Sequence, residues 1–114
     1  MKQTVDLTII ESQALGAGFT TPAINVSPYQ LVSMQIIFDF SGGATSAGSV
    51  SLQSSNDGVN FSTVPSSSLS YTNTTTNHII ELQRVGFKFL RLANTHSIGT
   101  GGTAKVIAHC TIGL

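Results

Sequence analysis

The chain is poor in charged side chains, with five basic and five acidic residues among its 114. Charged residues make up 9% of the sequence, against about 25% in a typical soluble domain. A surface that binds nucleic acid or an anionic membrane needs clustered lysine and arginine to neutralise phosphates. We therefore expect neither nucleic acid nor a membrane among the partners of this protein.

Several other sequence features are also absent, and each absence limits the class of protein to which this chain can belong. Tryptophan is missing, and Cys110 is the single cysteine, so the chain cannot form an internal disulfide. No apolar run approaches the roughly 20 residues that cross a bilayer as a helix. Residues 1–6 contain no apolar segment typical of a secretory signal, so we expect no export and synthesis in the cytoplasm of a host cell.

Residues that could carry chemistry are few and scattered. His109 and Cys110 are adjacent in a predicted strand, so their side chains point to opposite faces. Cys110 has no basic neighbour that would lower its pKa, and a small core side chain is its expected role. The sequence contains no G-x-S-x-G elbow, phosphate-binding glycine loop or H-E-x-x-H pattern. We expect no enzymatic activity, no metal and no cofactor. The remaining candidate side chains lie in separate elements: His78, His96, Asp6, Asp39, Asp57 and Glu81.

Serine and threonine are abundant, supplying 29 residues, and glycine supplies another 11. Hydrophobic residues reach 40% and the mean hydropathy is +0.24, which is incompatible with disorder. The surface must then be covered by hydroxyls and amides. Because the formal net charge is zero, little repulsion opposes association, and such a surface suits a protein that works within an assembly.

Apolar residues alternate with polar ones along almost the whole chain, which predicts β-strands. The strongest predicted strand is 31–40, with Val32, Met34, Ile36 and Phe38 on one face. Leu31, Ile37 and Phe40 partly break the alternation, which indicates a central or bulged strand. The full prediction is eight strands, near residues 4–9, 24–26, 31–40, 50–55, 61–64, 79–82, 87–93 and 104–112.

Eight strands separated by turn signals predict a single all-β domain over residues 1–114. The expected architecture is an antiparallel two-sheet β-sandwich of jelly-roll type. Two segments are expected to be loops by composition, 41–48 and 66–77, the second of which holds Leu69 and Tyr71. Crossovers between the sheets are expected after Phe40 and Val64, where loops can also contact partners.

Asn56-Asp57-Gly58 lies between two alternating segments and predicts a hairpin with a type I′ turn, which needs positive φ at both central residues. Three aromatic residues of the predicted strands 61–64 and 87–93 are expected to enter the core: Phe61, Phe87 and Phe89. Arg91, in the last of these strands, is expected to lie over a sheet face or to pair with an acid.

Together, the S-N-D-G-x-N-F hairpin at residues 55–61, the F-L-R strand at 89–91 and the following glycine-rich loop resemble small β-sandwich proteins of tailed-phage virions. These are head decoration, cement and fibre proteins. The same pattern is similar to discoidin-type galactose-binding-like sandwiches. This chain departs from the discoidin pattern in its length, its lack of tryptophan and its lack of a flanking cysteine pair.

The resemblance implies a structural protein on the capsid surface of a virion, where it binds the major capsid protein and further copies of itself as a homodimer or homotrimer. The N-terminal strand is expected to face the shell, and the loop 41–48 to face neighbouring subunits. The alternative is a carbohydrate- or receptor-binding module of a tail or fibre, with Tyr71 or Tyr29 as an exposed aromatic platform. The candidate interaction residues are Ser41, Gly42, Gly43, Asn56, Asp57, Gly58 and Tyr71.

Overall fold

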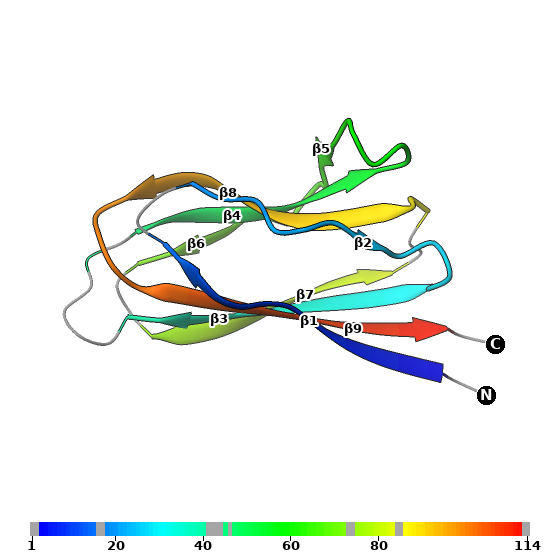
Figure 1. Cartoon of the computed structure of the whole chain (residues 1–114), viewed down its shortest axis with the longest axis horizontal. Coiled ribbons are helices and arrows are strands. Elements are labelled where there is room, and N and C mark those ends of the chain that lie inside the picture. Colours follow the sequence, from blue (N-terminus) through cyan, green and yellow to red (C-terminus); the bar gives the residue numbers. More distant parts are fainter. Residues whose placement is uncertain are drawn as a thin grey trace.

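Two antiparallel sheets face each other in the computed structural model, which describes residues 3–15, 18–40, 45, 47–72, 75–83 and 86–112 (Figure 1). The elements of this described part are all strands, which confirms the predicted all-β sandwich. The nine strands are β1 (Gln3–Ala14), β2 (Ile24–Asn25), β3 (Leu31–Asp39), β4 (Ala47–Ser55), β5 (Ser62–Thr63), β6 (Leu69–Tyr71), β7 (Thr76–Gln83), β8 (Phe89–Ile98) and β9 (Thr103–Ile112).

The strand order is that of a jelly roll. Sheet A has the order β1-β9-β3-β7, and sheet B has the order β2-β8-β4, with β5 and β6 both pairing with the outer edge of β4. Early strands therefore pair with late strands in reverse order: β1 with β9, β2 with β8, β3 with β7, and β4 with β5 and β6. The chain thus has the order of one long hairpin that folds over into two sheets. As a result, β3 also pairs with β9, and β4 also pairs with β8.

The strand that the eight-strand prediction lacked is β6, which lies within 66–77, the segment that composition predicted to be a loop. That prediction is wrong for residues 69–71, which pair with Gly48–Val50 of β4. The hydrogen bonds of Ser67 explain how this polar segment can run along the edge of sheet B that β4 forms. Ser67 is 2% exposed; its Oγ accepts a hydrogen bond from Leu52 N (3.1 Å) and donates one to Val64 O (2.6 Å). A hydroxyl thus fills the gap between β5 and β6 along β4.

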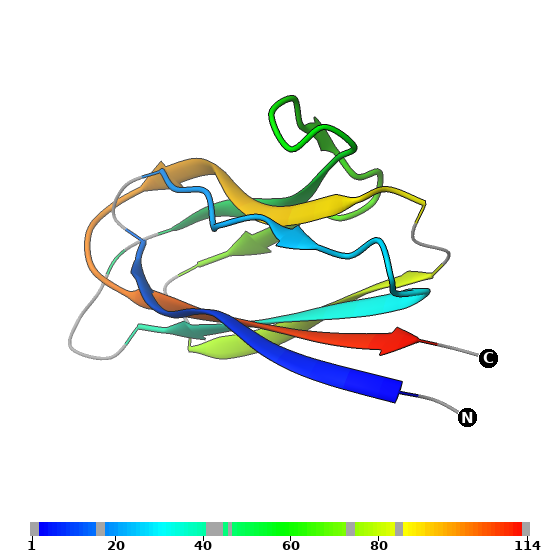
Figure 2. The same cartoon turned by 45° about the vertical axis from the view of Figure 1, so that its right-hand side comes forward.

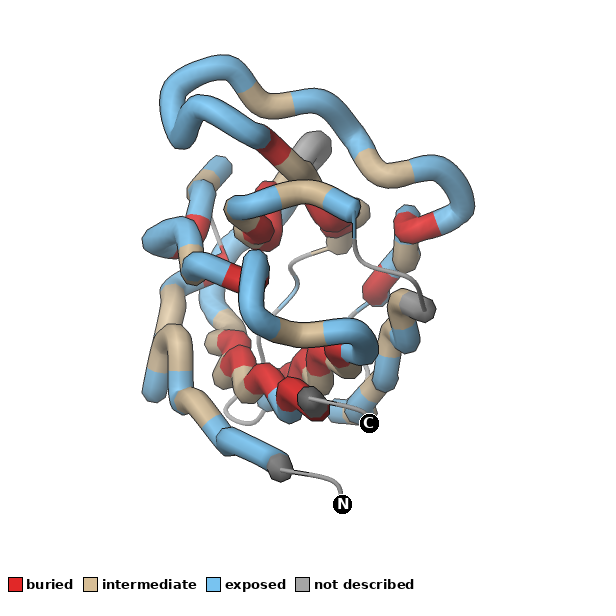
Figure 3. Tube along the Cα trace, turned by 90° about the vertical axis from the view of Figure 1, so that its right-hand side faces the viewer, coloured by how far each residue is buried: buried red, intermediate tan, exposed pale blue. Residues whose placement is uncertain are grey.

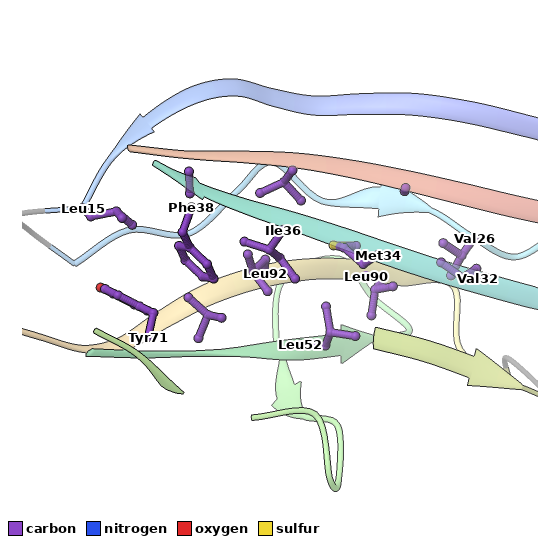
Figure 4. Close-up of a cluster of buried hydrophobic side chains, with 14 of the residues drawn as sticks. Leu15, Val26, Val32, Met34, Ile36, Phe38, Leu52, Tyr71, Leu90 and Leu92 are labelled. Atoms are coloured by element: carbon purple, nitrogen blue, oxygen red, sulfur yellow. The ribbon is translucent and has the colours of Figure 1, made fainter. Parts of the chain in front are cut away.

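The core lies between the two sheets and is built from alternating inward side chains. Val32, Met34, Ile36 and Phe38 of β3 are all buried on one face, as predicted (Figure 4). Strand β3 is central, because it pairs with β7 on one side and β9 on the other without a shift in register. A view along the long axis shows the buried residues on the strands where the layers face each other (Figure 3). The facing residues include Val50, Leu52, Leu90, Leu92, Val106, Ala108 and Cys110.

Three stacked rings fill one end of the core. The Tyr71 ring centroid lies 4.9 Å from that of Phe38 and 6.0 Å from that of Phe40. Tyr71 is 3% exposed, and its hydroxyl oxygen accepts a hydrogen bond from Asn94 Nδ2 (2.6 Å). The expected exposed platform at Tyr71 is therefore wrong. Pairing with β4 sets Tyr71 opposite Gly48, on the same face as the buried Val50, so its ring enters the core.

Gly102 closes this end of the sandwich and provides a test of the packing. Its φ is +82°, and a Cβ added there would lie 2.8 Å from Cδ1 of Phe40. We expect Gly102→Ala to lower the free energy of unfolding by about 1–3 kcal/mol, because the ring must shift and the backbone becomes strained. The measurement is urea denaturation. Gly86→Ala is the control, since nothing lies within 4 Å of its added Cβ, and equal losses in both variants would contradict this account.

Candidate interaction loop

The connection from β4 to β5 projects from sheet B beyond the body of the sandwich (Figures 1 and 2). This segment, residues 55–61, is here called the Asp57 loop. It contains three of the predicted interaction residues, Asn56, Asp57 and Gly58. The pairing of Ser54 with Ser62 closes its base. The structure therefore places these three residues together on one protruding feature.

The Asp57 carboxylate organises the loop from within. Oδ1 accepts hydrogen bonds from the backbone N–H groups of Val59 and Asn60 (both 2.8 Å) and from Ser55 Oγ (2.9 Å). Oδ2 accepts one from Asn60 Nδ2 (2.9 Å). Donors aimed at the charged form, first of all the Asn60 N–H, hold the pKa of Asp57 well below its ordinary value. The carboxylate is thus an internal acceptor for the loop and is already occupied.

The predicted type I′ turn is wrong, although the position of the reversal is right. Gly58, with φ of +77°, is the one residue of the Asp57 loop with positive φ, whereas a type I′ turn requires two in succession. Ser55 supplies further contacts: its Oγ accepts hydrogen bonds from the N–H groups of Asp57 (3.2 Å) and Gly58 (2.9 Å). Side-chain acceptors here replace the short backbone turn and allow a longer loop.

The base of the loop is bound to the outer side of β8. Lys88 N donates to Asn56 Oδ1 (3.1 Å) and to the Ser55 carbonyl (3.2 Å). Gly58 lies over the Phe89 ring, whose Cε2 would be 3.4 Å from an added Cβ. An added Cβ would touch the ring, and the φ of +77° would strain the backbone of any residue other than glycine there. Hydrogen bonds and close packing therefore fix the loop relative to the sheet.

Phe61 and Arg91 pack against each other beneath the loop. Cζ of Arg91 lies 3.8 Å from the centroid of the Phe61 ring, and Arg91 Nε donates to Gln53 Oε1 (2.8 Å). This confirms that Arg91 lies over a sheet face. Phe61 and Phe89 are half-buried on that outer face, so their assignment to the sandwich core is wrong. Leu90 and Leu92 are the residues of β8 that point inward, while Phe87 is half-buried against the core.

The loop presents an apolar side chain that sequence analysis did not single out. Val59 is 79% exposed, next to the hydrogen-bonded network that holds its backbone N–H. Val59 is thus an exposed aliphatic side chain on a loop whose conformation is fixed by side-chain hydrogen bonds. The available signal was the apolar residue between Gly58 and Asn60 in a turn that is otherwise polar.

Tyr71, another predicted interaction residue, does not join this loop. It pairs with Gly48 at the start of β4, whereas the Asp57 loop follows the end of β4. Ser41, Gly42 and Gly43 lie outside the described residues. Of the four predicted interaction residues that the structure describes, three therefore form one cluster.

Titratable side chains outside the Asp57 loop include an exposed pair and a buried thiol. Asp6 Oδ1 pairs with His109 Nδ1 across β1 and β9 on the surface. Cys110 is fully buried, and burial raises the pKa of its thiol, which fits the predicted core role. Among the described residues, no three histidine, cysteine, aspartate or glutamate side chains converge as a metal site would require. Within the same part of the chain, no helix is long and apolar enough to cross a membrane.

Replacing Asp57 tests the loop network through its pH dependence. A carboxyl whose pKa is lowered by folding stabilises the fold above its unfolded pKa, and this contribution falls away as the folded carboxyl is protonated. We expect Asp57→Asn to lower the Tm at neutral pH, with a smaller difference from the wild type in strong acid. Thermal unfolding from pH 7 to well below pH 4 measures this. A difference in Tm that does not change with pH would contradict it, and Glu81→Gln controls for charge.

No protein-family model and no curated protein sequence matches this chain. Several solved structures, in contrast, are similar to this chain. The SPBc2 prophage-derived protein YomS is 12% identical, with a TM-score of 0.61 over 97% of this chain and 95% of that one. The VP2 protein of infectious bursal disease virus, from T=1 particles, is 14% identical, with a TM-score of 0.57 over 97% of this chain and 32% of that one.

A third similar structure is a mutant of CBM29-2, a carbohydrate-binding module of family 29. It is 9% identical, with a TM-score of 0.50 over 95% of this chain and 92% of that one. At such identities the likeness establishes the fold alone. The chain therefore shares its β-sandwich architecture with a prophage-derived protein, a viral protein that forms particles and a sugar-binding module.

Proposed function

We propose that this protein is a structural component of a phage virion that binds the outer surface of the capsid as a decoration or cement protein. The observation that carries the proposal is the jelly roll, which spans nearly the whole chain and matches prophage-derived YomS along 95% of that protein. The likeness to a VP2 protein in T=1 particles supports the same role. The S-N-D-G-x-N-F hairpin that resembles virion proteins is the projecting Asp57 loop.

The proposed mechanism is binding without reaction. A protein that binds the assembled shell but not its separated subunits stabilises the shell by mass action. Many copies on one particle make even weak contacts effective. The Asp57 loop suits this task because its conformation is fixed before contact, so little conformational entropy is lost when Val59 is buried. A surface with zero formal net charge meets no strong repulsion from a neighbouring copy.

The N-terminal strand remains our second proposed shell contact. Strand β1 is a long edge strand of sheet A that pairs with β9 on one side. Its register with β9 shifts between Thr8 and Ile10 and again between Ile10 and Gln13. Such irregularities prevent uncontrolled pairing of an edge while leaving shorter stretches open to a specific partner.

Density-gradient co-sedimentation with mature heads from the parent lysate tests the function. We expect saturable, stoichiometric binding that raises the melting temperature of the heads. Val59→Lys should weaken binding about tenfold or more, because a buried aliphatic contact is lost and a charge is introduced. Ser68→Lys is the matched control, since Ser68 is also exposed near sheet B. A protein that stays at the top of the gradient, or travels only with tails, would overturn the proposal.

The alternative function is a carbohydrate- or receptor-binding module of a tail or fibre, which the likeness to CBM29-2 favours. Its predicted platform has lost support, because Tyr71 is buried and Tyr29 is half-buried against the core. A glycan-binding screen separates the two functions. A saturable sugar signal together with no binding to heads would replace the decoration proposal.

A further inference from the structure

Three isoleucines gather on the outer face of sheet A. Gln35 of β3 lies opposite Ile107 of β9 and Ile79 of β7, and Ile37 lies two residues further along β3. Opposed residues of an antiparallel sheet share a face, and the core face of β3 belongs to Met34 and Ile36. Ile37, Ile79 and Ile107 therefore point away from the core, and we call them the isoleucine face. Ile79 is 58% exposed.

The two outer faces of the sandwich differ in what covers them. The Asp57 loop is bound against sheet B, where its residues rest on Phe89 and Arg91. No described segment crosses the outer face of sheet A (Figures 1 and 2). Aliphatic side chains on an uncovered sheet mark a surface for another protein.

The strand register of sheet A makes the isoleucine face of one copy complementary to the same face of a second copy. Strands β9 and β7 flank β3, so a two-fold axis along β3 would lay β9 of one copy on β7 of the other. Ile107 would then face the partner's Ile79, and Ile37 would face the partner's Ile37. His109 and Glu81 both lie opposite Ser33, so His109 would face the partner's Glu81. We propose that two copies of this chain pack face to face through the isoleucine face.

Hydrogen-bonding groups and surface shape also agree with a second copy as the occupant. An imidazole lies against a carboxylate on both sides of the axis, and Asp6 orients that imidazole through Nδ1. A hollow of about 200 Å³ lies between Leu31, Ser33, Glu81, His109 and Thr111. Leu31 lies in line with Ile37 along β3 and borders this hollow, so each Leu31 would face the partner's Leu31 beside the two hollows. It is 40% exposed in the single chain.

The size of the interface sets the expected strength. Strands about 4.8 Å apart, with outward residues about 6.8 Å apart along each, give roughly 500 Å² for β9, β3 and β7 together. Stable specific interfaces bury about 800 Å² per partner. The dimer should therefore be weak and depend on protein concentration. This proposal does not depend on capsid binding, because it concerns the purified protein alone.

Sedimentation velocity of the purified full-length protein, from micromolar to near-millimolar concentration, tests the interface. We expect a monomer–dimer equilibrium in which Ile107→Lys and Ile79→Lys each weaken association about tenfold or more. Ser68→Lys is the control and should leave association unchanged, because Ser68 is exposed and lies near sheet B. Ile79 is well exposed, so its variant keeps the test valid if Ile107→Lys does not fold. A monomer at all concentrations, or a dimer that both lysine variants leave intact, would overturn the proposal.

A cysteine on the axis gives a second, direct readout. Ile37→Cys should form an intermolecular disulfide under mild oxidation, because each Ile37 faces its counterpart across the two-fold axis. Native Cys110 is fully buried and does not compete. Ser68→Cys, at an exposed position near sheet B, is the control for random collision. Pairing through the free edge of β7 would tolerate Ile107→Lys and would not cross-link Ile37→Cys faster than the control, and that result would also overturn the proposal.

Discussion

The alternating burial of β3 is the constraint on which the rest of the structure depends. Val32, Met34, Ile36 and Phe38 place one face of this strand in the core, and β7 and β9 align to it from both sides. A shift of one residue would exchange buried and exposed faces of the strand. The register of sheet A is thereby determined, and with it the positions of Ile37, Ile79 and Ile107 on the opposite face.

Periodicity predicted the elements whose two faces differ clearly. Strands β3 and β9 have an unbroken row of apolar residues on one face, and both were located from that pattern. Strand β8 has apolar residues on both faces, so alternation alone could not show that Phe89 points outward and Leu90 inward. Strand β6 was missed because it is short and polar, and because its pairing depends on the distant Ser67 contact with Leu52. Such contacts are not visible in local composition.

The candidate site was predictable in position but not in form. Asp57 and Gly58 correctly marked a chain reversal, since both residue types favour turns. The length of the loop follows from bonds between Asp57, Ser55 and Asn60, which sequence spacing does not specify. Tyr71 was assigned to a loop, because the serine- and threonine-rich segment around it hid a strand. Its burial follows from its pairing opposite Gly48, a long-range feature.

The Asp57 loop and the isoleucine face lie on opposite layers of the sandwich, and this arrangement makes the molecule two-sided. A copy held on a shell by its loop, as proposed above, would turn its isoleucine face outward. A second copy added there would direct its own loop away from the shell. The accessory layer would then be two molecules deep, and the outermost surface of the particle would carry a regular array of unoccupied loops.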